Sequence, residues 1–384
     1  MPDPRQPIAP ALPRLALPRR AVLMAALGLG AGSAWSDAAH APALQPRPLR
    51  FPADFGSHPD TAIEWWYLTG DLQGAGQRWG FQVTFFRSRV PQAQALRSNL
   101  AARQLIFAHV AITDVAAGRL HHDQRVARSA GGSVADRAWA LEGDTDVRID
   151  HWTLRRLPND HYQIHIDTPE LALELTLQPT QPLLLQGDTG WSRKGPKPTQ
   201  ASFYYSQPQL RVNGALRLGA RKVPIQGRGW LDHEWSQSLL DPQAVGWDWL
   251  GMNLDDGATL TAFRLRTAQG QALWAGGSWR AHADAPVQAL GPQQVRMKPL
   301  AHWTSAATGT RYPVAWALEI ALDSAAQALR SYRVQAVVNA QELDSRTSTG
   351  AIYWEGLSTL STPSGQPLGS GYLELTGYAS PLRL

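Results

Sequence analysis

Residues 65–87 read WWYLTGDLQGAGQRWGFQVTFFR, and this stretch decides the fold class. Its second half alternates between apolar and polar residues as half-buried strands do, and Gly74-Ala75-Gly76 separates it from the first half as a hairpin turn would. Residues 65–89 and 247–266 share one order of residues: W-x-aromatic-L-x-x-(D/N)-L, a turn, then T-x-F-R-x-R. We therefore predict two similar antiparallel hairpins, one in each of two related β-domains.

The rest of the chain also favours strands. Residues 161–166 (HYQIHI), 171–177 (LALELTL) and 316–322 (WALEIAL) alternate in the same way, and turn-forming residues separate such runs. Only residues 91–104 (PQAQALRSNLAARQ) suggest a helix. We predict an all-β protein whose antiparallel sheets form a barrel or a sandwich in each domain.

The composition of the 384 residues narrows the class of protein. Hydrophobic residues make up 43% and charged residues 17%, which excludes general disorder. The absence of cysteine excludes a disulfide scaffold. The 16 Trp residues suit a sheet-lined apolar cavity that also offers partners to the indole N–H. Four Arg and one Asp lie in residues 1–34, and without them the net charge falls from +5 to +2, so we expect no nucleic-acid partner.

The first 34 residues have the pattern of an export signal. Arg19-Arg20 precede an apolar run at 21–31 (AVLMAALGLGA), and small residues follow it. The run is too short to span a bilayer. The Arg pair also suits the twin-arginine route. We therefore expect a signal peptide at 1–34, a periplasmic or secreted mature protein, and an extended proline-rich segment at 35–56.

Polar residues gather beside tryptophans in three segments. These are residues 57–67 (SHPDTAIEWWY), residues 227–235 with 246–249 (GRGWLDHEW and GWDW), and residues 353–356 with 371–378 (YWEG and GYLELTGY). An apolar wall raises the pKa of a carboxyl group, which keeps a general acid protonated near neutral pH. Aromatic faces also stabilise a cationic intermediate. The alternative is that these polar groups form buried structural networks.

Asp232-His233-Glu234-Trp235 is the densest of these groups. Successive side chains of a strand point to opposite faces, so Asp232 and Glu234 share one face while His233 and Trp235 share the other. This alternation argues against a single metal ion held by all three ionisable residues. We expect His233 and Trp235 to face the ligand and Asp232 and Glu234 to support them. A buried histidine with a purely structural role is the alternative.

Together these segments resemble one family, the AttH-like proteins, which include the carotenoid 1,2-hydratases (hydroxyneurosporene synthases). The resemblance runs from about residue 55 to the C-terminus. The motifs that carry it, in chain order, are His58-Pro59-Asp60, 64–67 (EWWY), 80–87 (GFQVTFFR), 107–114 (FAHVAITD), 204–206 (YYS), 229–235 (GWLDHEW), 246–249 (GWDW), 353–356 (YWEG) and 371–378 (GYLELTGY).

The resemblance implies two lipocalin-like β-domains in tandem, here expected at residues 57–230 and 231–384, with a hydrophobic ligand held in or between them. It implies a hydro-lyase that needs no cofactor: a carboxyl group protonates a C=C bond of an isoprenoid or lipid, and water captures the cation. In the carotenoid-acting branch the proton-donating Asp lies on the strand after the Asp-His-x-Trp segment, whereas residues 258–266 (ATLTAFRLR) carry no acid.

A second reading of the same resemblance is a non-catalytic periplasmic carrier of a lipid. Some members of the family are linked to ABC export systems, so components of such a transporter and a peripheral membrane contact are the expected partners of a carrier. The sequence leaves the two alternatives open.

Candidate roles follow from these arguments, with no metal and no cofactor among them. The candidate catalytic residues are Asp232, His233, Glu234 and Asp248. The candidate ligand-binding residues are Glu64, Trp66, Tyr204, Trp235, Trp247, Trp249, Tyr353, Trp354, Glu355 and Tyr372.

If the leader uses the twin-arginine route, replacing both Arg19 and Arg20 with Lys is expected to trap the precursor in the cytoplasm, because that route requires the Arg pair. Cell fractionation followed by immunoblotting measures the share of protein that reaches the periplasm. Undiminished export of the double variant would mean that the leader uses the general secretory route or is not a signal.

Overall fold

The structure, a computed structural model, describes residues 44–384 except 99, 131–136, 239, 323–328 and 383–384. The predicted signal peptide at 1–34 and the first part of the proline-rich segment lie outside the described residues. The residues described form 23 β-strands and two single-turn 3₁₀-helices, with no α-helix among them, so the predicted all-β class is confirmed. No helix in this part of the chain is long and apolar enough to cross a membrane.

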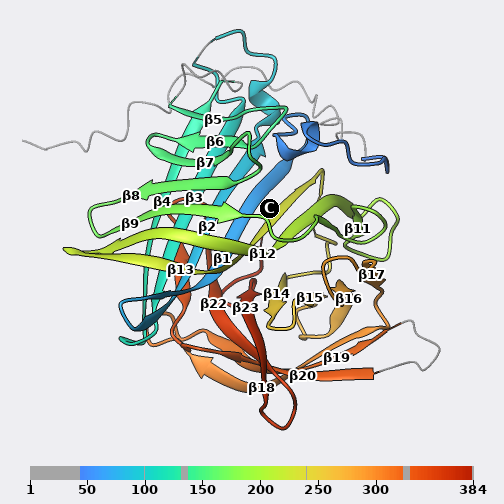
Figure 1. The fold of residues 1–384 in the computed structure, drawn as a ribbon. Helices are drawn as coiled ribbons and strands as arrows, with labels where there is room; N and C mark the ends of the chain where they lie inside the picture. Colours follow the sequence, from blue (N-terminus) through green and yellow to red (C-terminus); the bar gives the residue numbers. More distant parts are fainter. Residues whose placement is uncertain (1–43, 99, 131–136, 239, 323–328, 383–384) are drawn as a thin grey trace, which may run out of the picture. The chain divides into compact units, whose positions relative to one another are not determined.

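The first antiparallel sheet contains the strands β1 to β13. Its order is β4-β3-β2-β1-β13-β12-β9-β8-β7-β6-β5, with β10 and β11 paired to β12. The edge strands β4 and β5 contact each other, so the sheet curls into a nearly closed barrel (Figure 1). Its strands are β1 Ile63–Gly74, β2 Gln77–Arg89, β3 Gln104–Asp114, β4 Arg119–Ser129, β5 Ala138–Ala140, β6 Asp146–Ile149, β7 Trp152–Arg156, β8 Tyr162–Asp167, β9 Leu171–Gln178, β10 Leu184–Leu185, β11 Trp191–Arg193, β12 Ala201–Leu218 and β13 Arg221–Ser236.

The second antiparallel sheet contains β14 to β23 in the order β17-β16-β15-β14-β23-β22-β20-β19-β18, with β21 paired to β22. Strands β16 and β18, from its two sides, contact each other. Its strands are β14 Gly246–Leu254, β15 Thr259–Arg266, β16 Ala272–Arg280, β17 Gln288–Leu290, β18 Val295–Thr304, β19 Arg311–Ala321, β20 Leu329–Ala336, β21 Glu342–Ser345, β22 Ala351–Ser361 and β23 Pro367–Leu375. The two sheets are the predicted lipocalin-like pair. The chain passes from one to the other between Ser236 and Gly246, and residues 230 and 231, where we expected the domain boundary, lie inside β13.

Each sheet encloses its own hydrophobic core, and the two-residue period of the strands decides which side chains enter it. Along β9, Leu171, Leu173, Leu175 and Leu177 are buried while the residues between them reach the outer side. A separate core inside the second sheet includes Trp316 and Trp354. The interior of both sheets is therefore filled with side chains of the chain itself.

The two hairpins predicted from the repeated motif both form. β1 pairs with β2 around Gly74, and β14 pairs with β15 around the turn at residues 255–258. The hairpins hold equivalent places, because β1 also pairs with β13 and β14 also pairs with β23. The repeat in the sequence thus corresponds to a repeat in the topology.

The helix expected at residues 91–104 is wrong. Only Pro91–Ala93 form a 3₁₀ turn, and β3 already begins at Gln104. The Gln94 amide donates to the carbonyl oxygens of Val90 at 2.9 Å and Arg103 at 2.7 Å, which closes the segment as a loop. This stretch has no continuous apolar stripe to bury, and a short helix gains most of its stability from burying one. In the proline-rich segment, Ala53–Phe55 form a 3₁₀ turn that we did not expect.

Polar side chains join the two sheets. A bulge in β12 between Gln207 and Leu210 turns the Gln209 N–H toward the Asn253 Oδ1 at 2.8 Å. Asn253 donates in turn to the Gly229 carbonyl at 3.0 Å. Elsewhere the Tyr353 hydroxyl lies 2.6 Å from the His109 Nδ1. These contacts fix β12 and β13 against β14, and β3 against β22.

Replacing Gly70 with Ala is expected to lower the free energy of unfolding by about 1–3 kcal/mol, the usual cost of overpacking a core. A Cβ there would lie 2.3 Å from Phe81 Cε1 and 2.6 Å from the Arg228 carbonyl oxygen. Gly291→Ala is the matched control, since the nearest neighbour of its Cβ would be Gln294 Oε1 at 3.5 Å. Urea unfolding measures both. Equal stability of the two variants would contradict close packing at Gly70.

Candidate functional site

A cavity of about 330 Å³ lies between the two sheets, outside both hydrophobic cores. Both motif hairpins line it with equivalent residues: Trp65 and Tyr67 on β1 correspond to Trp247 and Trp249 on β14. The residues between them point away, Trp66 into the first core and Asp248 into its own ion pairs. Alternation along the strands therefore separates the cavity wall from the cores. The wall is further lined by Ile63, Thr84, Phe86, Arg87, Ser88, Phe107, Lys194, Tyr204, Asp232, Glu234, Leu240, Phe263, Leu265, Ser348, Thr349, Glu355 and Glu374.

Two of the carboxyl groups in the wall belong to β13. Burial raises the pKa of Asp232 to about 7, although hydrogen bonds from Ser206 and Trp230 oppose that rise. Glu234 accepts from Ser202 and forms an ion pair with Lys194 at 2.9 Å. Both side chains are therefore held in place by neighbouring donors.

The other two carboxyl groups, Glu355 on β22 and Glu374 on β23, lie directly opposite each other in the ladder. Burial raises the pKa of both carboxyl groups. Repulsion by Glu374 raises the pKa of Glu355 further, and repulsion by Asp232 and Glu234 does the same for Glu374. For Glu374 the pKa rises to about 8, against a hydrogen bond from Trp247. A protonated carboxyl group at neutral pH is thus placed in an aromatic cavity.

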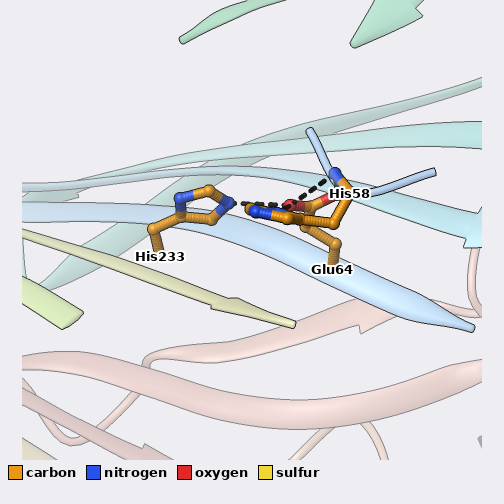
Figure 2. Close-up of side chains that lie close together, drawn as sticks. All are labelled: His58, Glu64 and His233. Carbon is orange, nitrogen blue, oxygen red and sulfur yellow. Dashed lines mark hydrogen bonds and ion pairs between the residues drawn. The ribbon is translucent and has the colours of Figure 1, made fainter. Parts of the chain in front are cut away.

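A second group of ionisable residues lies inside the first sheet. His58, Glu64 and His233 converge, with both imidazole rings reaching the Glu64 carboxylate (Figure 2). The His58 Nδ1 lies 2.7 Å from Glu64 Oε1, and the His233 Nε2 lies 2.9 Å from the same oxygen. Arg87 donates to Glu64 Oε2 at 2.8 Å. Glu64, Arg87 and His233 are all buried.

The protonation states of this group follow from its contacts. Burial alone would raise the pKa of Glu64, but the charge of Arg87 and the two imidazoles hold it well below its usual range. Burial lowers the pKa of His233 to about 4, so neutral His233 donates to Glu64 and accepts from the Tyr205 hydroxyl at 3.0 Å. Contacts with Asp54 and Glu64 raise the pKa of His58 against the opposing effect of burial.

The same three residues also offer a divalent cation two imidazoles and one carboxylate. Binding would require both imidazoles to give up their hydrogen bonds to Glu64, and the cation would lie close to the guanidinium of Arg87. As it stands, the group is a closed hydrogen-bond network that joins the segment before β1 to β1, β2 and β13.

The predicted site residues divide into two sets. Asp232, Glu234, Tyr204, Trp247, Trp249 and Glu355 line the cavity. Glu64, Trp66, His233 and Trp235 are buried within the first core network, and Asp248 pairs with Arg264 and Arg266. Trp354 belongs to the second core, Tyr353 contacts His109 between the sheets, and Tyr372 is buried beside the cavity.

The expected orientation of the densest motif is therefore wrong. Asp232 and Glu234 face the cavity, and His233 and Trp235 face the first core. The two pairs of side chains do lie on opposite faces of β13, as predicted. We assigned the wrong pair to the cavity, because we expected an imidazole beside an indole to face a ligand. His233 instead stacks on Trp66 at 4.5 Å between ring centroids.

Sequence reasoning missed Trp65, Tyr67, Lys194 and Glu374 as lining residues. A signal existed for Tyr67 and Trp65, since the repeat aligns them with Trp249 and Trp247. Glu374 lies in a motif that we singled out, but only the strand pairing shows that it faces Glu355.

Fold and site together define a class: a tandem lipocalin-like protein whose aromatic cavity lies between the two sheets. The AttH-like family matches residues 42–378, and the chain belongs to it. A protein from Nitrosomonas europaea whose crystal structure is described as an AttH is 44% identical, with a TM-score of 0.78 over 88% of this chain and 99% of that one. Among curated proteins, none matches this chain.

Two more distant structures share the fold. Kievitone hydratase from Nectria haematococca is 14% identical, with a TM-score of 0.65 over 87% of this chain and 94% of that one. CghA, solved with Sch210972, is also 14% identical, with a TM-score of 0.55 over 84% of this chain and 90% of that one. At this identity the likeness shows the fold alone.

Replacing Arg87 with Met is expected to cost about 3–5 kcal/mol of unfolding free energy, because it leaves Glu64 charged and buried without its cation. Arg78→Met on the same strand removes a partly exposed pair with Asp71 and should cost less than about 1 kcal/mol. The pKa of Glu64 is lowered by folding, so its stabilisation is lost as the pH falls, and Arg87→Met should lose less stability on acidification. Urea titrations at several pH values measure both effects. Similar losses in the two variants would contradict the central role of this pair.

Proposed function

We propose that this AttH-like protein binds a hydrophobic isoprenoid or lipid in the cavity between its sheets and adds water across a C=C bond of that ligand by acid catalysis. The observation that carries the proposal is the combination of aromatic walls with buried carboxyl groups of raised pKa in one cavity. Apolar walls bind the chain of such a ligand, and a carboxyl group that keeps its proton at neutral pH can give it to an alkene carbon.

The aromatic side chains support the second half of this reaction. Protonating an alkene leaves a carbocation, and aromatic faces stabilise a positive charge held over them. Trp65, Trp247 and Trp249 lie in the same wall as the carboxyl groups. The distant likeness to a hydratase agrees with this chemistry at the level of the fold.

The second candidate function is transport of the ligand without chemistry. The observation that favours it lies on β15, where the described strand carries no acid and Arg264 pairs with Asp248. In that case the carboxyl groups would hydrogen-bond a polar end of the ligand. In both cases we propose that the leader exports the protein to the periplasm, where a carrier would meet a membrane or an ABC export system.

Acyclic isoprenoid alkenes incubated with the protein in water enriched in the heavy oxygen isotope are expected to gain one labelled hydroxyl group, detected by mass spectrometry. Mass spectrometry of lipids that copurify with the protein would guide the choice of alkenes. Ser88→Trp, at the half-buried edge of the cavity, should weaken binding of a fluorescent fatty acid at least about tenfold. Ser331→Trp, on the exposed face of β20, is the matched control.

Binding that Ser88→Trp weakens, without any labelled product, would favour the carrier. Binding that neither tryptophan variant changes would place the ligand elsewhere and contradict both functions of the cavity.

A further inference from the structure

The carboxyl groups of the chain differ in how their charge is compensated. Glu64, Glu234 and Asp248 each have a cationic partner, namely Arg87, Lys194 and the pair Arg264 with Arg266. Within the described residues, neither Glu355 nor Glu374 forms an ion pair with Lys, Arg or His. Two adjacent carboxyl groups without a cation, one buried and the other half-buried, cannot both be charged at modest cost.

The register places these two side chains together. Glu355 and Glu374 are directly opposite in the antiparallel pair of β22 and β23, where Cβ atoms lie about 4.5–5.5 Å apart and point to the same face. That face is the cavity wall. Two carboxyl groups at this spacing can share one proton, as coupled acids do.

Unpartnered polar atoms point to the place that a ligand or water would occupy. Glu355 Oε2 is buried and has no hydrogen-bond partner, and the same is true of the Tyr67 hydroxyl. Both residues line the cavity. Buried polar atoms are rarely left without a partner, so this corner is built to receive a polar group.

We propose that Glu355 and Glu374 share one proton and together form the acid that protonates the double bond of the ligand, an inference that rests on the proposed function. The protonated carboxyl gives its proton to one alkene carbon, forming a C–H bond as the π bond breaks. A water molecule bonds through its oxygen to the resulting carbocation. The carboxylate takes up the proton that this water releases, which restores the pair, and the net change is addition of one water.

Asp232 is the other carboxyl group in the wall with a raised pKa. Its Oδ1 already accepts from Ser206 and from the Trp230 indole at 2.7 Å. These donors stabilise the charged form and hold the side chain against β12. The glutamate pair lacks such restraint at Glu355 Oε2, which is why the pair and not Asp232 is assigned as the acid.

Asp232 and Glu234 face the pair from β13, and their charge disfavours a second negative charge on it. Tyr67 on β1, Tyr353 on β22 and Tyr372 on β23 lie nearby, and burial raises the pKa of these hydroxyls, so they stay neutral. Turnover should therefore be retained at neutral pH and fall as the pH rises through the pKa of the pair, because the reactive form is the protonated one. Removing one glutamate removes its repulsion, so the remaining one should titrate at a lower pH.

Glu355→Gln and Glu374→Gln test the assignment in the full-length mature protein. Each is expected to lower incorporation of labelled oxygen at least about 100-fold while fluorescent fatty-acid binding stays within about threefold, since a positioned acid typically contributes 10²–10⁴ in rate. Glu174→Gln, an exposed change of the same kind on β9, is the control. Glu374 is only half-buried, so its variant remains informative if Glu355→Gln does not fold.

A second readout does not depend on turnover. Infrared spectra at neutral pH should show the C=O stretch of a protonated carboxyl, and each glutamine variant should shift its titration to lower pH. A spectrum with no protonated carboxyl assignable to the pair overturns the proposal. If both glutamine variants still form labelled product, the assignment of Glu355 and Glu374 as the acid is overturned, while the proposed hydration stands. If the wild-type protein hydrates no alkene, both the proposed hydration and this assignment are overturned.

Discussion

The ion pair between Glu64 and Arg87 is the interaction on which the first sheet depends. Glu64 is fully buried and accepts from five donors: the Ser57 hydroxyl, the His58 N–H and Nδ1, Arg87 Nε and His233 Nε2. Arg87 in turn donates to the carbonyl oxygens of His58 and Thr61. A buried charge is tolerated only when it is paired and hydrogen-bonded, so the segment before β1 must keep its position for β1, β2 and β13 to meet.

The network around Glu64 explains why the motif at residues 232–235 serves both the first core and the cavity wall. His233 completes the network around Glu64, and its strand neighbours Asp232 and Glu234 must then point to the other side. The outer face of β13 meets the second sheet, so the cavity forms between the sheets and not inside a barrel. Both cores are filled with side chains, and the cavity lies outside them.

Compensation of charge distinguishes the pair Glu355 and Glu374 from Glu64, Asp248 and Glu234, which each have a cationic partner. Asp248 in the second hairpin is compensated in the same way as Glu64. Arg264 lies opposite it in the ladder of β14 and β15, Arg266 lies two residues further along β15, and both form ion pairs with it. Such pairs hold neighbouring strands together. Glu355 and Glu374 have no such partner among the described residues, and uncompensated carboxyl groups keep protons that chemistry can use.

The amino-acid sequence alone was enough to predict the all-β class and the two hairpins, because these depend on local propensity and on strand geometry. It misplaced a helix at 91–104, where local composition was ambiguous and loop hydrogen bonds decided the conformation. Which face of β13 meets the cavity, and that Glu374 lies opposite Glu355, became clear only from the folded structure. The first depends on the pairing of β13 with β1, which are far apart in the sequence, and the second on the register of the hairpin formed by β22 and β23. Alternation within one strand carries no information about its neighbours.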